Sequence, residues 1–96
     1  MFGIGLLLAG LAIAFISVAI LTYAAIKKWF RENSTVDKDN VRAIIQEAMD
    51  NGEYRVVQCV FNRKRKEITA VKGYHTKERD DELIKKGPEA IIKEEC

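Results

Sequence analysis

One apolar stretch, MFGIGLLLAGLAIAFISVAILTYAAI (Met1–Ile26), decides the fold expected for this chain. The chain has 96 residues, and all of its 16 Lys and Arg and 14 Asp and Glu residues follow Ile26. As an α-helix the stretch would be about 39 Å long, more than the roughly 30 Å hydrocarbon core of a bilayer. The sequence therefore predicts one N-terminal transmembrane α-helix over residues 1–26.

A cleaved signal peptide is the alternative interpretation of this stretch. It lacks a positively charged start, it is longer than the apolar part of such peptides, and no small-residue cleavage site precedes a mature start, so we favour an uncleaved anchor. Positive side chains mark the cytoplasmic end of a span, and five of them follow closely: Lys27, Lys28, Arg31, Lys38 and Arg42. We expect a single-pass membrane protein with its N-terminus outside and residues 27–96 in the cytoplasm.

Small side chains recur along the predicted span. Gly3, Gly10, Ser17 and Ala24 are spaced seven residues apart, and Ala14 lies one helical turn beyond Gly10. Small residues let two membrane helices approach closely, so these five predict a surface that packs against a partner helix. The alternative is chance, because Gly and Ala are common in such helices.

The rest of the chain has the composition of a polar globular domain. We expect a juxtamembrane linker at 27–36 and a small α-β-β-α cytoplasmic domain at 37–96 that ends in a C-terminal tail. The first helix is predicted from apolar residues with helical spacing, between a cap at Asp37 or Asp39 and the turn residue Gly52. These apolar residues are Val41, Ile44, Ile45, Ala48 and Met49.

A β-hairpin is predicted next, from two β-branched runs at 54–61 and 67–74 that a polar turn separates. Gly73 is interpreted as a bulge or a bend near the end of the second strand. Thr76 is expected to cap a last helix that ends before Pro88. The tail has one apolar cluster, for which a helical turn, a third strand and an adhesive end all remain open.

A two-stranded sheet is only marginally stable in water. Either edge of the predicted hairpin could accept a strand from a partner or from a second copy of the chain. An obligate assembly would supply the missing contacts, which favours a subunit of a larger complex.

Residues that catalysis or metal binding requires are scarce. His75 is the only histidine, and it is expected at the surface near the end of a strand. Cys59 and Cys96 are 37 residues apart without a CxxC motif, so no zinc site is predicted and Cys59 is expected in the hairpin core. The acidic cluster after Thr76 fits a helix N-terminus and lacks the ligand pattern of a metal loop. We therefore expect no enzyme activity, no metal and no cofactor.

Four positive side chains form the densest feature, at the predicted hairpin tip: Arg63, Lys64, Arg65 and Lys66. With Lys72 and Lys77 they could form a basic finger that contacts anionic lipid headgroups, the phosphates of a nucleic acid or an acidic protein surface. The absence of an interleaved aromatic residue disfavours nucleic acid. The alternative is a solvated turn that keeps the strand ends soluble.

We favour the hypothesis of a non-enzymatic, single-span accessory or assembly subunit, whose small-residue helix packs against transmembrane helices and whose cytoplasmic domain docks on a partner. That partner would be a membrane protein complex or further copies of this chain. The first alternative is a membrane-tethered basic module that binds nucleic acid or anionic lipid through residues 63–66. The second is a membrane-perturbing, holin-like factor, which the structured polar domain disfavours.

Overall fold

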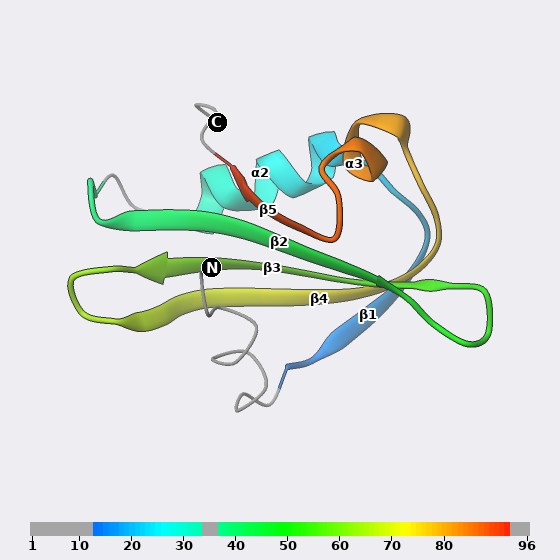
Figure 1. The fold of residues 1–96 in the computed structure, drawn as a ribbon, viewed down its shortest axis with the longest axis horizontal. Coiled ribbons are helices and arrows are strands. Elements are labelled where there is room, and N and C mark those ends of the chain that lie inside the picture. Colours follow the sequence, from blue (N-terminus) through cyan, green and yellow to red (C-terminus); the bar gives the residue numbers. More distant parts are fainter. Residues whose placement is uncertain (1–12, 34–36, 93–96) are drawn as a thin grey trace.

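Five strands and two helices form the part of the chain that the computed structural model describes, residues 13–33 and 37–92 (Figure 1). In chain order they are β1 (Phe15–Leu21), α2 (Tyr23–Asn33), β2 (Asn40–Ala48), β3 (Tyr54–Asn62), β4 (Glu67–Arg79), α3 (Asp81–Lys85) and β5 (Glu89–Ile92). The strands make one sheet in the order β1-β4-β3-β2-β5. β1 runs parallel to β4, and the other neighbouring pairs are antiparallel. The predicted fold class, a transmembrane helix followed by a helix, a hairpin and a helix, was therefore wrong.

The central hairpin confirms the prediction for 54–61 and 67–74. β3 pairs antiparallel with β4 along its whole length. β4 continues to Arg79, because its second half pairs with β1 as well as with β3. Thr76 consequently lies buried within β4 and does not cap a helix.

The last helix, α3, is short and begins later than predicted. Asp80 caps it, since its Oδ1 accepts a hydrogen bond from the Leu83 N–H at 3.1 Å. The same oxygen accepts the Tyr23 N–H at 3.1 Å and so ties the start of α2 to the start of α3. Gly87 follows with a φ of +82°, a left-handed conformation that favours glycine after a helix. The apolar cluster of the tail lies in β5, so of the three alternatives left open for it the strand is the one found.

The predicted helix over 41–49 was wrong, because these residues form β2. β2 lies between β3 and β5, and its adjacent residues Ala43 and Ile44 point to opposite faces of the sheet and are both buried. A strand that is buried on both faces carries apolar residues on both, and their spacing then resembles that of a helix. The β-branched side chains of Val41, Ile44 and Ile45 favour the strand.

The predicted transmembrane helix over 1–26 is contradicted as well. Its described part divides into β1 and the start of α2, a helix of 11 residues that also includes most of the expected linker. Among the described residues, no helix is long and apolar enough to cross a membrane. An apolar run alone does not distinguish a strand from a helix, and the β-branched Ile16, Val18 and Ile20 pair with β4. This finding contradicts the single-pass membrane location, with the N-terminus outside and the domain in the cytoplasm.

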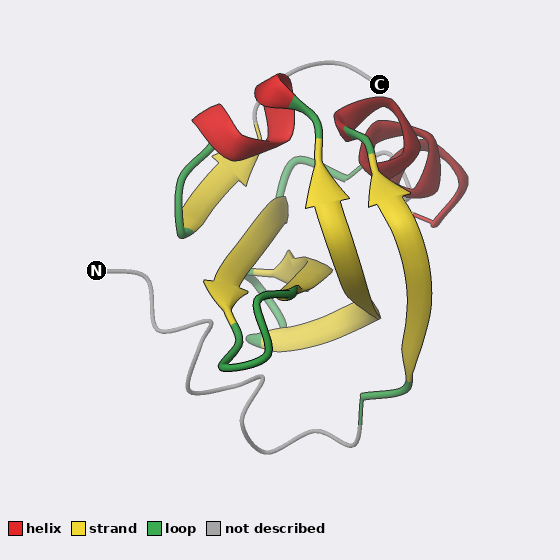
Figure 2. Ribbon diagram, turned by 90° about the vertical axis from the view of Figure 1, so that its right-hand side faces the viewer, coloured by secondary structure: helices red, strands yellow, loops and turns green. Residues whose placement is uncertain are grey.

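Both helices lie on one side of the twisted sheet (Figures 1 and 2). α2 buries Tyr23, Ile26 and Phe30, which are three and four residues apart and therefore lie on one face of the helix. They pack against one residue of α3 and apolar residues from every strand of the sheet. These partners are Leu83 of α3 with Leu21, Ile44, Val56, Val60, Tyr74 and Ile92.

Candidate functional site

β1 forms one edge of the sheet, and in the described chain β4 is the only strand beside it (Figure 2). Its sequence, FISVAIL, has no charged residue and no proline, although these are the residues with which proteins usually protect a free edge. Ile16 is 45% exposed and Ile20 is 59% exposed. β1 therefore has the properties of a strand that can receive another strand.

The backbone groups of β1 alternate between β4 and the open edge. The Leu21 carbonyl accepts a hydrogen bond from the Asp80 N–H at 3.2 Å, and the Ala19 carbonyl lies 3.5 Å from the Thr76 hydroxyl of β4. Peptide groups of alternate residues point to the same side of a strand, so these two residues bond towards β4. The N–H and C=O groups of the even-numbered residues Ile16, Val18 and Ile20 consequently point to the open edge.

A close contact with glycine fixes β1 on β4. Phe15 pairs with Gly73, and its ring lies so close that a Cβ at Gly73 would be 2.6 Å from two ring carbons. The same ring stacks on His75, with the ring centroids 4.7 Å apart. Gly73, predicted to be a bulge or a bend, instead makes room for Phe15. His75, expected at the surface, is half-buried beside the ring.

β5, at the opposite edge of the sheet, is less suited to strand addition. It has four residues, begins with Glu89 and follows Pro88. A short strand, a charge and a proline all discourage pairing at an edge. The open side of β1 is therefore the candidate interaction site.

The sheet face opposite the helices carries a second apolar cluster. Ala43, Val57 and Cys59 form its buried centre. Partly buried side chains surround this centre: Ile13, Phe15, Ile45, Phe61, Ile68 and Val71. Burial raises the pKa of the Cys59 thiol from 9.0 to about 12, so the thiol is protonated at neutral pH and is not a nucleophile. The prediction of Cys59 as a core residue is confirmed.

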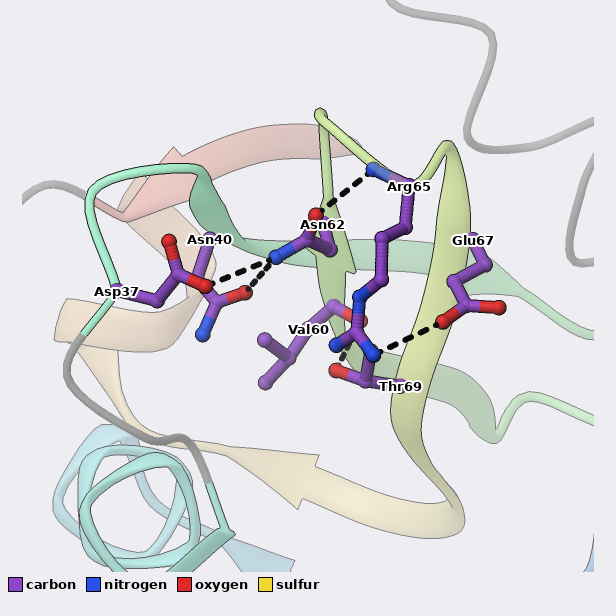
Figure 3. A network of polar contacts seen from close by, with 7 residues as sticks. All are labelled: Asp37, Asn40, Val60, Asn62, Arg65, Glu67 and Thr69. Atoms are coloured by element: carbon purple, nitrogen blue, oxygen red, sulfur yellow. Dashed lines mark hydrogen bonds and ion pairs between the residues drawn. The ribbon is translucent and has the colours of Figure 1, made fainter.

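The four positive residues of the predicted hairpin tip do form the β3–β4 turn, and all are exposed: Arg63, Lys64, Arg65 and Lys66. The buried Asn62 holds this turn (Figure 3). Its Oδ1 accepts the Arg65 backbone N–H at 2.9 Å, and its Nδ2 donates to Asp37 Oδ2 at 3.2 Å and to Asn40 Oδ1 at 3.0 Å. The loop before β2 therefore supports the turn.

Two of the four charges in the turn have partners within the fold. The Arg63 guanidinium donates to the Lys38 carbonyl at 3.1 Å. Arg65 forms an ion pair with Glu67 at 3.4 Å (Figure 3). Both contacts hold the arginine side chains in place, and the Arg65–Glu67 pair offsets one of the four charges, which favours the interpretation of a solvated turn.

The other two charges, Lys64 and Lys66, stand apart from further basic residues of the hairpin. Lys72 lies over the Tyr74 ring, with its Nζ 5.4 Å from the ring centroid. Lys77 is eleven residues beyond Lys66 along an extended strand, which separates them by about 36 Å. Lys72 and Lys77 therefore do not extend the turn into the basic finger that the sequence suggested.

The five small residues predicted to pack against a partner helix do not share one helix. Gly3 and Gly10 lie outside the described residues. Ala14 precedes β1, Ser17 lies within β1 and Ala24 lies in α2, and all three are exposed. Because Ser17 and Ala24 belong to different elements, the helical spacing does not align them.

The sequence pattern did not predict a polar cluster beneath α3. Gln46 of β2 is buried, and its Nε2 donates to the Leu83 carbonyl at 2.8 Å and to the Gly87 carbonyl at 3.0 Å. Its Oε1 accepts a hydrogen bond from Arg79 at 2.9 Å, and the Arg79 guanidinium lies 3.8 Å from the centre of the Tyr54 ring. These contacts hold α3 and the loop after it against the sheet, so the cluster has a structural role.

Among residues 13–33 and 37–92, no group of three His, Cys, Asp or Glu side chains could hold a metal ion. Comparisons of the chain with protein-family models, with curated proteins and with solved structures give no match. The open edge of β1 is therefore the feature on which a functional proposal can rest.

Proposed function

We propose that this protein is a non-enzymatic assembly module that joins a partner through the open edge of β1. One observation carries the proposal, namely that an uncharged edge strand of seven residues turns the backbone groups of three residues outward. A strand added at such an edge binds through main-chain hydrogen bonds, and its side chains provide selectivity. The accessory or assembly role expected from the sequence is thus kept, and the transmembrane helix predicted over residues 1–26 is not part of this proposal.

The composition of β1 also limits the kind of partner strand. Ile16 and Ile20 stand in solvent beside the edge, so a partner strand gains most if it presents apolar side chains next to them. Each main-chain hydrogen bond adds about 0.5–1.5 kcal/mol net. An apolar partner strand of similar length is therefore the best match.

The basic turn at 63–66 supports a second function less well. Arg63 and Arg65 already contact the Lys38 carbonyl and Glu67. The two remaining lysines offer only a weak attraction to phosphate groups, which salt would screen. For this reason we do not propose binding of nucleic acid or lipid.

The proposal is tested by purifying the full chain from its native cells through a tag placed after Cys96. Lysine at an edge position opposes strand pairing, so Ile16→Lys and Ile20→Lys are compared with Ile84→Lys, which changes a 47% exposed isoleucine of α3. We expect the wild type and Ile84→Lys to retain the same bound protein, including further copies of the chain, and both edge variants to lose it. Equal retention by all four chains would overturn the proposal.

A further inference from the structure

We infer that the strand which β1 receives is β1 of a second copy, paired antiparallel about a two-fold axis that passes through Val18. This inference rests on the proposed function and names its partner. It joins the sheets of the two copies into one continuous sheet, with the two β1 strands at its centre. The order of side chains in β1 carries the inference, together with the direction of its backbone groups.

The sequence of β1 is nearly symmetric about Val18. Reading outward from Val18, the strand has a small residue on each side, then an isoleucine, then a large apolar residue. These pairs are Ser17 with Ala19, Ile16 with Ile20, and Phe15 with Leu21. Antiparallel pairing about Val18 therefore places each residue opposite one of similar size, which suits an interface made by the same surface of both copies.

The direction of the peptide groups selects the same register. In an antiparallel pair, residues that exchange both hydrogen bonds lie directly opposite each other. Ile16, Val18 and Ile20 turn their N–H and C=O groups to the open edge, as shown by the Ala19 and Leu21 carbonyls that face β4. With Val18 opposite Val18, Ile16 lies opposite Ile20 of the second copy, and the outward groups of all three residues find partners.

Burial and charge also favour a second copy. The two exposed large apolar side chains of the strand, Ile16 and Ile20, become direct cross-strand neighbours on one face. β1 has no charged residue, so no like charges meet across the axis. The pairing leaves α2 and α3 in place, because both pack on a face of the sheet and not on its edge.

The first test is the mass of the purified full chain, measured by sedimentation equilibrium over a range of concentrations. We expect a dimer for the wild type and for Ile91→Lys, which places a lysine on the opposite edge strand. In Ile16→Lys or Ile20→Lys, symmetry places two lysines in each interface, and we expect the Kd of the dimer to rise by about tenfold or more. A wild-type chain that stays monomeric, or a dimer that tolerates both edge variants, would overturn the inference.

Cysteine cross-linking then tests the register, in a Cys96→Ser background that keeps the buried Cys59. Cα atoms of directly opposed residues are about 5.5 Å apart, within the range that a disulfide spans. Val18→Cys should therefore form a covalent dimer on oxidation. Ile16→Cys alone should not, because its two copies lie about 14 Å apart along the strand, whereas a mixture of Ile16→Cys and Ile20→Cys chains should cross-link.

Equal cross-linking at positions 16, 18 and 20 would indicate parallel pairing and would overturn the antiparallel register.

The two proposals also fail differently. If the purified chain is monomeric but Ile16→Lys and Ile20→Lys still lose a different protein captured from cells, the second copy is rejected as partner and strand addition at β1 stands. If those variants lose neither a second copy nor another protein, both proposals fall.

Discussion

Substitution of Gly73 by alanine tests the contact that fixes β1 on β4. The added Cβ would be 2.6 Å from Cδ2 and Cε2 of the Phe15 ring and 3.0 Å from Cγ2 of Ile13. Carbon atoms in favourable contact are about 3.5–4.0 Å apart, so the ring must move by about 1 Å and leave its stacked position on His75. Overpacking of this kind costs about 1–3 kcal/mol.

The backbone preference of alanine opposes this cost. Glycine within a strand is less favourable than alanine by about 0.5–1 kcal/mol. We therefore expect Gly73→Ala to lower the free energy of unfolding by about 1 kcal/mol, or the Tm by about 4–8 °C for a domain of this size. In a Phe15→Ala background both ring contacts are absent and only the 3.0 Å contact with Ile13 Cγ2 remains. The backbone preference should then outweigh the remaining contact, and the same change should stabilise the chain by up to about 0.5 kcal/mol.

The double-mutant cycle consists of the wild type, Gly73→Ala, Phe15→Ala and the variant with both changes. Urea unfolding of these four chains, followed by circular dichroism, measures whether the effect of Gly73→Ala on the free energy of unfolding changes sign. Phe61→Ala provides a matched background, because Phe61 lies in the same apolar cluster but is not among the atoms nearest the added Cβ. Gly73→Ala should destabilise that background as it does the wild type. An equal effect of Gly73→Ala in the Phe15→Ala and Phe61→Ala backgrounds would refute the packing of β1 against β4.

Three further changes test the polar contacts and the buried thiol. Asn62→Ala removes the hydrogen bonds that hold the basic turn and should lower the free energy of unfolding by about 1–3 kcal/mol, whereas the exposed Lys64→Ala should change it by no more than about 0.5 kcal/mol. Gln46→Leu leaves the Gly87 carbonyl and the Arg79 guanidinium without their Gln46 partner, and the Leu83 carbonyl keeps only the Lys86 N–H. Hydrogen exchange should therefore show faster opening of α3, and urea unfolding should show a free energy of unfolding lower by about 2–3 kcal/mol. The folded chain keeps the Cys59 proton to about pH 12, but the unfolded chain loses it above the ordinary pKa of 9.0. Stability should therefore fall by about 1.4 kcal/mol between pH 8 and pH 10, and Cys59→Ala should abolish most of that fall; an unchanged fall would place the thiol in solvent.

The hairpin of β3 and β4 was predictable because its signals are local. Two β-branched runs and the polar residues between them specify strand, turn and strand within 54–74. β2 was not predictable in the same way, because its helix-like spacing reflects burial on both faces of the sheet. Ile44 packs in the core beneath the helices, and Ala43 packs in the apolar cluster on the opposite face. The β-branched residues favour a strand locally, but the pairing with β3 and β5, which follow later in the chain, decides between strand and helix.

The same reasoning explains the error over 1–26. An apolar run does not show by itself whether the segment crosses a bilayer or pairs as a strand in a sheet. β1 pairs with residues from Gly73 to Arg79, and no sequence feature near Ile16 or Val18 indicates that these distant residues are its partner. The open edge could not be predicted either, because it depends on β1 being the last of the strands in the described part of the chain.

The basic turn was placed correctly, yet its contacts were not foreseen. Arg63 donates a hydrogen bond to the Lys38 carbonyl, and Arg65 forms an ion pair with Glu67. Lys38 belongs to the loop before β2. The buried Asn62 gave a partial signal, since a polar residue at the end of an apolar strand often caps a turn. The density of positive charge alone therefore overstated how many side chains of the turn are available to bind an anionic ligand.

The pairing of β1 with β4 has a consequence for synthesis of the chain. Ala19 meets Thr76 only after 57 further residues have been made, which takes roughly 3–12 s at about 5–20 residues per second. During that interval a nascent strand without charge or proline has no place in a sheet, and contacts of such long range also form slowly once they are possible. Rare codons or translational pauses between residues 21 and 79 would lengthen this interval, so the yield of folded protein should depend on elongation speed in that stretch and on chaperones that bind apolar nascent segments.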